Sequence, residues 1–291
     1  MVIDFEYKVN DEWYEGVYKD KNEPCSAARP FSLKHSPKSD KAVLCIHGYT
    51  GYPGEVTRPA VDLYEAGFDV YAPRLPGHGT TGEDFINIKY EDIVSVVLKA
   101  AEDLCASYGI VHVFGHSMGG GLALITASQV KGIKSVAVAG PAASENKSKL
   151  PVNPLLMKLL GAFKKRMPNK WAPDPEYIMY YEGAPKDDLY LGKEYWSWLY
   201  PRQLTMLFKV MLEAGKALDD IDRDILTISG GKDSIIGEGS SLLIMEKGKG
   251  RNRHLHLDNA THYMFYDKDK SEEQRAVESV LDWFCAHNGA V

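Results

Sequence analysis

A serine with glycine two positions away on either side is the first feature with chemical potential. Ser117 lies in residues 115–119, which read GHSMG. Residues 110–114 before it are rich in β-branched and apolar types, and residues 120–127 after it have the composition of a buried helix. A serine at a tight strand-to-helix turn presents its hydroxyl as a nucleophile, and small neighbours let strand and helix pass closely. The motif alone is a weak signal, so a glycine-rich turn with an incidental serine is the alternative.

Two later residues could activate this hydroxyl. Asp233 follows a predicted strand at residues 224–229, and His262 follows one at residues 254–257. An imidazole takes the serine proton during attack on a carbonyl carbon, and a carboxylate behind the ring fixes its tautomer. Because all three residues come just after predicted strands, we expect Ser117, Asp233 and His262 to meet at one edge of a sheet. A turn aspartate and a surface-loop histidine are the alternative interpretations.

The other histidines are weaker candidates for the base. His254 and His256 share one face of the last predicted strand, and His287 lies in the last predicted helix. His112 lies within a strand, where a hydrogen-bonded core role is expected, and His78 lies in a Pro-Gly-His-Gly loop that favours a structural role. The histidines lack metal-ligand spacing, so the sequence predicts neither a metal site nor a cofactor.

Acyl transfer also needs fixed N–H donors for the negative oxygen of the transition state. Met118 comes directly after the serine, at the start of the predicted helix. Tyr49 comes directly after a His-Gly pair, in the loop that follows the apolar run Lys41–Ile46. We expect the backbone N–H groups of Met118 and Tyr49 to form the oxyanion hole. An ordinary turn at residues 47–51 is the alternative.

Strands and helices alternate around these loops. Strands are predicted at residues 41–46, 68–72, 110–114, 134–140, 224–229 and 254–257, and helices at 53–67, 90–108, 155–163, 204–218, 240–247 and 272–287. This rhythm predicts an α/β fold with a mostly parallel sheet and helices on both faces. Residues 5–18 are predicted to form short strands, and residues 22–40 to form irregular chain.

The alternation stops at Pro141. Residues 142–221 are rich in helical and aromatic patterns and contain several prolines. We therefore divide the chain into an α/β core, residues 1–141 and 222–291, and a helical lid insert, residues 142–221, that lies over Ser117. The apolar and aromatic insert suggests an acyl chain or an aromatic acid beneath the lid, with packing inside the insert itself as the alternative.

Composition limits the classes of partner. The chain has 291 residues, of which 44% are hydrophobic and 25% charged, and its formal net charge is −6. It has no long basic run, so nucleic acid is not expected, and no run of about 18 apolar residues that would predict stable membrane insertion. Four separated cysteines and the absence of a signal-peptide pattern predict free thiols and a cytoplasmic protein, without pointing to any oligomeric state.

Five motifs in this order resemble the α/β-hydrolase superfamily. They are HGYTG, PRLPGHG, GHSMGG, GGKD and NATH, ending at residues 51, 79, 120, 233 and 262. The closest resemblance is to the carboxylesterase and monoacylglycerol-lipase-like branch, whose members are often described as serine aminopeptidase-like hydrolases. It covers nearly the whole chain outside the insert, which is longer than the lid of compact bacterial esterases. The resemblance implies an α/β-hydrolase fold with Ser117 as nucleophile, Asp233 as acid, His262 as base, and Tyr49 and Met118 as oxyanion donors.

The implied activity is hydrolysis of a small-molecule carboxylic ester, with an apolar or aromatic acyl group, through an acyl-enzyme. An amide or peptide hydrolase, or an acyltransferase, would use the same residues. A non-catalytic binding module is a further alternative, as is transient membrane contact through basic residues beside the leucines of residues 155–163. An acidic cluster in the insert that binds a substrate amine would favour an aminopeptidase, and the candidates are Glu176, Glu182, Asp187 and Asp188.

Overall fold

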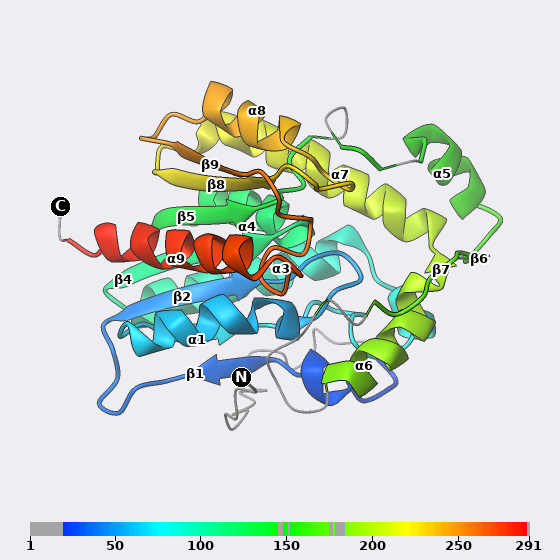
Figure 1. Ribbon diagram of the computed structural model, residues 1–291, viewed down its shortest axis with the longest axis horizontal. Coiled ribbons are helices and arrows are strands. Elements are labelled where there is room, and N and C mark those ends of the chain that lie inside the picture. The colour runs from blue at the N-terminus through cyan, green and yellow to red at the C-terminus, as the bar shows by residue number, and fades with distance from the viewer. Residues whose placement is uncertain (1–19, 145–147, 151, 175–176, 178–183, 290–291) are drawn as a thin grey trace.

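A sheet of seven strands runs through the centre of the chain, with helices on both of its faces (Figure 1). The computed structural model describes residues 20–144, 148–150, 152–174, 177 and 184–289. The strand order is β1-β3-β2-β4-β5-β8-β9. Each neighbouring pair is parallel except β1 and β3, which are antiparallel. The predicted α/β fold with a mostly parallel sheet is confirmed.

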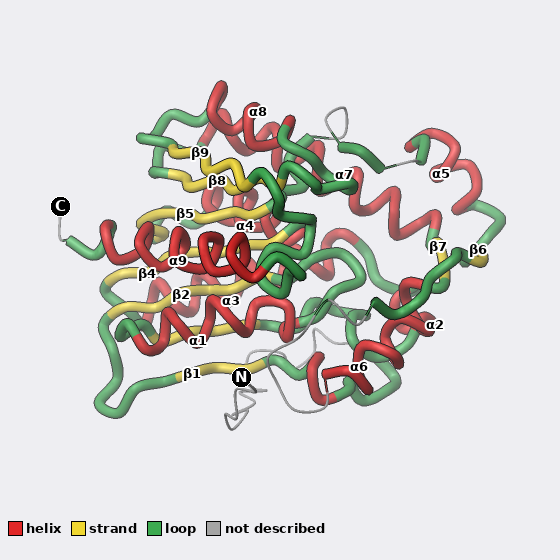
Figure 2. The backbone as a smooth tube through the Cα atoms, in the orientation of Figure 1, coloured by secondary structure: helices red, strands yellow, loops and turns green. Residues whose placement is uncertain are grey.

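Strands and helices alternate along the chain, as the colours of Figure 2 show. The strands of the sheet are β1 (Phe31–Leu33), β2 (Lys41–Ile46), β3 (Asp69–Ala72), β4 (Ile110–His116), β5 (Ile133–Ala139), β8 (Ile225–Gly230) and β9 (Arg253–Leu257). The helices outside the insert are α1 (Thr57–Glu65), α2 (Gly82–Phe85), α3 (Tyr90–Ser107), α4 (Met118–Gln129), α8 (Gly239–Lys247) and α9 (Lys270–Ala286). They match the predicted elements closely, except that α2 was not predicted and that a 3₁₀ turn (Pro53–Val56) lies ahead of α1.

The helices form one layer on each face of the sheet. In Figure 1, α1 and α9 lie together in front of the sheet, and α3 and α4 lie behind it. Strands β2 and β4 are buried along nearly their whole length because helices cover both faces. Ile46 at the end of β2 lies opposite Gly115 near the end of β4. The loops that follow these two strands therefore open at the same edge.

The prediction of irregular chain for residues 22–40 is wrong in part. This segment contains a 3₁₀ turn (Ser26–Ala28) and strand β1, which pairs with β3 at the edge of the sheet. A strand of three residues is too short for its alternating pattern to be recognised. The strands predicted for residues 5–18 lie outside the described residues.

Residues 142–221 connect β5 to β8. Their elements are α5 (Pro154–Gly161), β6 (Met167–Pro168), α6 (Ala184–Leu191), a π-helical turn (Gly192–Trp196), β7 (Trp198–Leu199), α7 (Pro201–Ala217) and a 3₁₀ turn (Leu218–Asp220). β6 and β7 pair antiparallel apart from the main sheet. Helix α7 packs against α4, the helix that follows Ser117. Helix α7 also packs against α5.

Helix α5 leaves most of its apolar side chains in solvent. Met157 is buried, whereas the exposed fractions of Leu155 and Leu159 are 77% and 61%, and that of Phe163, just after the helix, is 82%. These residues belong to the leucine stripe of the predicted helix, and they do not pack within the insert. Among the residues that the structure describes, no helix combines the length and apolar character needed to cross a membrane.

Candidate active site

Ser117 occupies the turn between β4 and α4 in a strained backbone conformation. Its φ of 56° and ψ of −120° lie in a region that residues with a side chain rarely adopt. A Cβ on Gly115 would lie 2.2 Å from the carbonyl oxygen of Gly119, and one on Gly119 would lie 2.1 Å from that of Ile46. Strand, helix and the end of β2 approach this closely only because the two positions lack side chains.

His262 and Asp233 complete a hydrogen-bonded chain with Ser117. His262 Nε2 lies 2.9 Å from Ser117 Oγ, and His262 Nδ1 lies 2.8 Å from Asp233 Oδ2. The residues come from the loops after β4, β8 and β9, and all three are buried. The structure therefore brings together the three side chains that the sequence analysis selected from separate parts of the chain.

Asp233 is held as an ionised acceptor. Its Oδ1 accepts the N–H groups of Ile235 and Ile236 at 2.8 and 2.9 Å, while Oδ2 faces His262. Burial acts to raise the pKa of Asp233, but the charge and hydrogen bond of His262 and the two N–H groups outweigh it and hold that pKa well below its usual range. A carboxylate in this position selects the Nδ1–H tautomer of His262 and stabilises an imidazolium.

Two residues that the sequence analysis left without a role support His262. His116 donates its Nε2–H to the backbone carbonyl of His262 at 2.7 Å. Gly140 follows β5, and a Cβ there would lie 3.2 Å from His262 Nδ1 and 3.3 Å from Asp233 Oδ2. His116 comes shortly after one predicted strand and Gly140 is the last residue of another, but their contacts join segments far apart in the chain, which no local pattern reveals.

The segments that carry the predicted oxyanion donors border Ser117. Met118 is the first residue of α4, where backbone N–H groups have no partner within the helix. Tyr49 lies in the loop after β2, and its neighbour Gly48 is so close to the serine that a Cβ on Gly48 would lie 3.1 Å from Ser117 Cβ. The Tyr49 ring packs edge-on against the Phe85 ring, with 5.5 Å between the ring centroids. This contact holds the Tyr49 side chain in place.

Glu55 braces the loop after β2 and was also missed. It is buried, its Oε2 accepts the N–H of Gly48 at 3.2 Å, and its Oε1 accepts the hydroxyl of Tyr266 at 3.4 Å. The same Oε2 lies 3.7 Å from His116 Nδ1. Glu55 therefore ties the loop after β2 to strand β4. Its own sequence neighbourhood, a turn before α1, carries no signal of this role.

A buried histidine joins this loop to the one after β3. His47 Nε2 accepts the N–H of Leu75 at 3.0 Å, and its Nδ1–H donates to the carbonyl of Gly48 at 3.0 Å. Burial, with a smaller effect from His78, lowers the pKa of His47 well below its usual value. The ring therefore stays neutral, as its accepting nitrogen requires.

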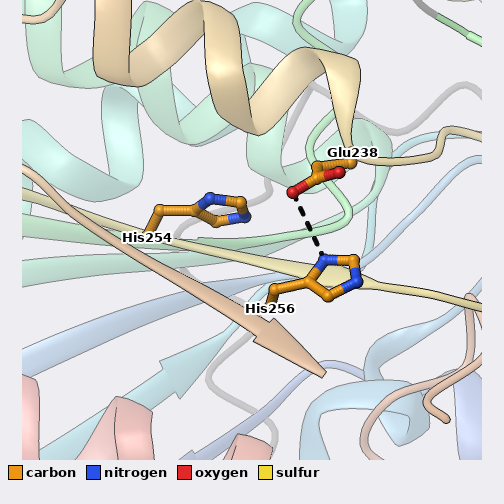
Figure 3. A group of neighbouring side chains, drawn as sticks. All are labelled: Glu238, His254 and His256. Atoms are coloured by element: carbon orange, nitrogen blue, oxygen red, sulfur yellow. Dashed lines mark ion pairs between the residues drawn. The ribbon is translucent and has the colours of Figure 1, made fainter. Parts of the chain in front are cut away.

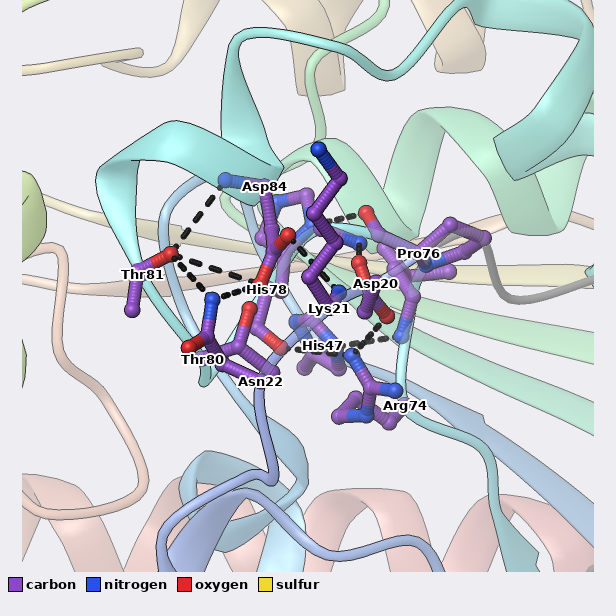
Figure 4. A network of polar contacts seen from close by, with 12 residues as sticks. Asp20, Lys21, Asn22, His47, Arg74, Pro76, His78, Thr80, Thr81 and Asp84 are labelled. Carbon is purple, nitrogen blue, oxygen red and sulfur yellow. Dashed lines mark hydrogen bonds and ion pairs between the residues drawn. The ribbon is translucent and has the colours of Figure 1, made fainter.

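Arg74 and His78 extend the network, which Figure 4 shows together with His47 and Asp20. Arg74 Nη1 donates to Asp20 Oδ2 at 2.8 Å and to the carbonyl of His78 at 2.9 Å. His78 Nδ1–H donates to the carbonyl of Pro76 at 2.9 Å, and burial lowers the pKa of His78 to about 4. His78 thus has structural contacts, as expected, and takes no part in the hydrogen-bonded chain at Ser117.

The insert contacts two of the loops around Ser117. Trp196 Nε1 donates to the carbonyl of Thr50 at 3.2 Å, in the loop after β2. The Tyr177 ring packs on that of Tyr263, with 4.9 Å between the centroids, directly beside His262 in the chain. Described parts of the insert therefore adjoin both sides of the site.

The acidic residues considered as amine ligands have partners inside the chain where they are described. Asp187 accepts hydrogen bonds from two residues of the 3₁₀ turn Ser26–Ala28. Asp188 accepts the hydroxyl of Tyr52, and burial raises the pKa of Asp188 to about 6. Glu176 and Glu182 lie outside the described residues.

Comparison with known proteins identifies the family. The model of a family described as "Serine aminopeptidase, S33" matches residues 37–269, which is most of the chain. The chain belongs to this family. It is an α/β hydrolase, and an enzyme of the lipase and esterase type. The resemblance inferred from the five motifs is confirmed.

Two relatives match this hydrolase over most of its length. A monoacylglycerol lipase of Mycolicibacterium smegmatis is 26% identical over 257 residues, which cover 84% of this chain and 88% of the relative. A thermostable monoacylglycerol lipase of Bacillus sp. (strain H-257) is 27% identical over 271 residues, which cover 91% and 97%. The solved Paleococcus ferrophilus monoacylglycerol lipase, at 21% identity, has a TM-score of 0.70 over 89% of this chain and 98% of its own, and so shares the fold.

Proposed function

We propose that this hydrolase cleaves carboxylic esters through an acyl-enzyme formed on Ser117. The observation that carries the proposal is the hydrogen-bonded chain Asp233–His262–Ser117, with separations of 2.8 and 2.9 Å, at a strained turn. A serine hydroxyl is a poor nucleophile until a neutral imidazole accepts its proton. His262 meets that need because Nδ1–H is engaged by Asp233, which leaves Nε2 to accept.

The reaction then follows two symmetrical halves. Ser117 Oγ attacks the ester carbonyl carbon while its proton passes to His262 Nε2, and the imidazolium returns that proton to the leaving alcohol. Water attacks the resulting acyl-enzyme in the same way and releases the acid. In both halves the oxyanion accepts the N–H groups of Tyr49 and Met118, and loss of one such donor typically costs about 10²–10³ in kcat.

Monoacylglycerols are the proposed substrates, with an apolar acyl group. The names of the two relatives that match most of the chain support this class. Residues 142–221 would act as a lid on the core formed by residues 1–141 and 222–291. Support comes from the contacts of Trp196 and Tyr177 with the loops around the site. A cytoplasmic location is proposed as well, and the four free cysteines support it.

Amide hydrolysis is the second candidate, because the matching family is described as a serine aminopeptidase and the same residues serve both reactions. Acyl transfer to an alcohol would also proceed through the same acyl-enzyme. The internal partners of Asp187 and Asp188 weaken the case for an amine-binding cluster in the insert. Comparing kcat/KM for a monoacylglycerol and an aminoacyl amide separates these activities, and added alcohol reveals transfer.

The first experiment measures hydrolysis of p-nitrophenyl esters of increasing acyl length, and of monoacylglycerols, by three proteins. The wild type is compared with Ser117→Ala and with Ser229→Ala, which removes another buried serine hydroxyl that is hydrogen-bonded to histidine. We expect Ser117→Ala to lose about 10⁴-fold or more in kcat and Ser229→Ala to remain active. Full activity of a folded Ser117→Ala protein would refute the proposal.

A further inference from the structure

A second group of histidines and a carboxylate lies between β9 and the start of α8, apart from the Ser117 chain. His254 and His256 are two positions apart on β9, so they project from the same face of this strand. Glu238 precedes α8 and reaches toward them, as Figure 3 shows. The carboxylate and imidazole atoms that these three residues offer all lie within 4.8 Å of one another.

The hydroxyl of Ser229 contacts both imidazole rings. It lies 2.8 Å from His254 Nε2 and 2.9 Å from His256 Nδ1, so one nitrogen of each ring points at the same spot. Ser229 is beside His256 in the pairing of β8 with β9. A hydroxyl has one proton, so it donates to only one of these nitrogens and requires the other to be protonated. A cation in front of the hydroxyl would instead accept a lone pair from both rings.

The spacing suits a small tetrahedral ion. Zn–N and Zn–O bonds of about 2.0–2.2 Å put neighbouring ligand atoms roughly 3.4 Å apart. Glu238 Oε1 lies 3.5 Å from His256 Nδ1, which already matches that separation. The remaining separations close by side-chain rotation, because the residues are half-buried and not packed in the core.

An outer carboxylate completes the arrangement. Asp258 Oδ1 lies 3.7 Å from His256 Nε2, the ring nitrogen that faces away from Glu238. Carboxylates on the far nitrogen of a ligating histidine commonly orient the ring and raise its basicity in zinc sites. Two imidazoles and a carboxylate are a donor set that favours Zn²⁺ over Mg²⁺ or Ca²⁺, which prefer all-oxygen sites.

We propose that Glu238, His254 and His256 form a binding site for a divalent transition-metal ion, with Zn²⁺ as the best fit. This site revises the expectation of no metal, which rested on spacing along the sequence alone. The loop that carries Asp233 runs from the end of β8 to Glu238, and the loop that carries His262 begins just after β9. A bound ion would tie α8 to the edge strand β9 at the base of both loops and raise the resistance of this region to unfolding.

The test is a calorimetric titration of the chelator-treated, tag-free full chain with Zn²⁺. We expect the titration to show one ion per chain. In thermal unfolding, Zn²⁺ at a hundredfold excess over Kd should raise the Tm by about 5 °C. His254→Gln, His256→Gln and Glu238→Gln should each weaken Zn²⁺ at least about tenfold. His35→Gln is the matched control, since His35 Nδ1 lies 2.9 Å from Asp69 Oδ1 in a pair outside the proposed site, and it should bind as the wild type does.

Co²⁺ in place of Zn²⁺ gives a readout that needs no variant to fold. A site of imidazole and carboxylate ligands gives visible d–d absorption without an intense thiolate-to-cobalt charge-transfer band. Absence of saturable Zn²⁺ binding by the wild type would overturn the proposal. So would undiminished binding in the three variants, or a thiolate band, which would assign the ion to one of the cysteines.

Discussion

Two aspartate–histidine pairs lie at opposite ends of strand β8. Asp224, just before the strand, has its Oδ2 3.1 Å from His287 Nε2, and Asp233, just after it, has its Oδ2 2.8 Å from His262 Nδ1. In both, burial acts to raise the pKa of the aspartate, and hydrogen bonds and nearby positive charge hold that pKa below its usual value. Distance and charge alone do not distinguish the two pairs.

The second nitrogen of each imidazole does distinguish them. His287 Nδ1 lies 2.7 Å from the carbonyl oxygen of Trp283 and Nε2 lies beside Asp224, so both nitrogens of His287 face acceptors. His262 Nε2 faces the hydroxyl of Ser117, which can donate to it. A general base needs one nitrogen held by an acceptor and the other open to a proton. At the carboxyl end of the parallel strands, His262 Nε2 faces the Ser117 hydroxyl, which can give it a proton. At the amino end, both nitrogens of His287 face acceptors.

Replacing each aspartate in turn is the strongest way to break this comparison. We expect Asp233→Asn to lower kcat by about 10³–10⁴, because an amide no longer selects the Nδ1–H tautomer of His262 or stabilises its imidazolium. Asp224→Asn is the matched control and should stay within about threefold of the wild type. Steady-state kinetics on one ester, with circular dichroism to verify folding, measures both. Equal losses in the two variants would show that the position along β8 does not matter.

His78, like His287, has its Nδ1 hydrogen-bonded to a backbone carbonyl, and its response to pH sharpens the comparison. The pKa of His78 is lowered to about 4 in the folded chain, so between about pH 6.5 and pH 4 the unfolded chain binds more protons at this residue. Its contribution to stability is therefore complete above about pH 6.5 and is lost as pH falls through about 4, by roughly 2–3 kcal/mol.

His78→Asn keeps a donor for the carbonyl of Pro76 but does not titrate. Urea unfolding at pH 7, 5.5 and 4 should show a smaller fall in the free energy of unfolding for the variant than for the wild type. Comparing each protein only with itself across pH removes any constant cost of the substitution. An identical pH dependence in both proteins would contradict the assigned burial effect.

The smallest expected effect concerns the backbone at Ser117 and Ser229, two of the serines that contact histidine. At Ser117 the positive φ favours glycine, so Ser117→Gly should be more stable than Ser117→Ala by about 1 kcal/mol. Ser229 lies inside β8, where the order should reverse and Ser229→Ala should exceed Ser229→Gly by roughly 0.5–1 kcal/mol. Thermal unfolding of the four variants measures both differences. The same order at both positions would mean that the Ser117 turn stores no strain.

The sequence was sufficient for the core elements and for the loops that carry the site. Apolar runs ending in glycine-bearing loops located β2, β4 and β8, because strands covered on both faces leave a continuous pattern. Ser117 and Asp233 could be selected since each follows such a run, and His262 since it follows the last predicted strand. Strand β1 could not be found, because three residues show no period and its partner β3 lies far along the chain.

The supporting contacts of the site were beyond local patterns. Glu55, His116 and Gly140 act through partners on other strands and loops, so their roles appear only when the chain is folded. The group of Glu238, His254 and His256 escaped for the same reason. The two histidines were seen to share a face, but the carboxylate that meets them stands before α8, in a separate element.

The long sequence separation between Ser117 and His262 affects when the site can form during synthesis of the chain. The two residues are 145 positions apart, and His262 follows β9, the last strand of the sheet to be synthesised. Contacts of such long range form late, since the chain between them must first be ordered. Activity would therefore appear only after the C-terminal strand has docked. Its recovery during refolding would report when β9 has docked, and a nascent chain still lacking β9 would be inactive toward esters.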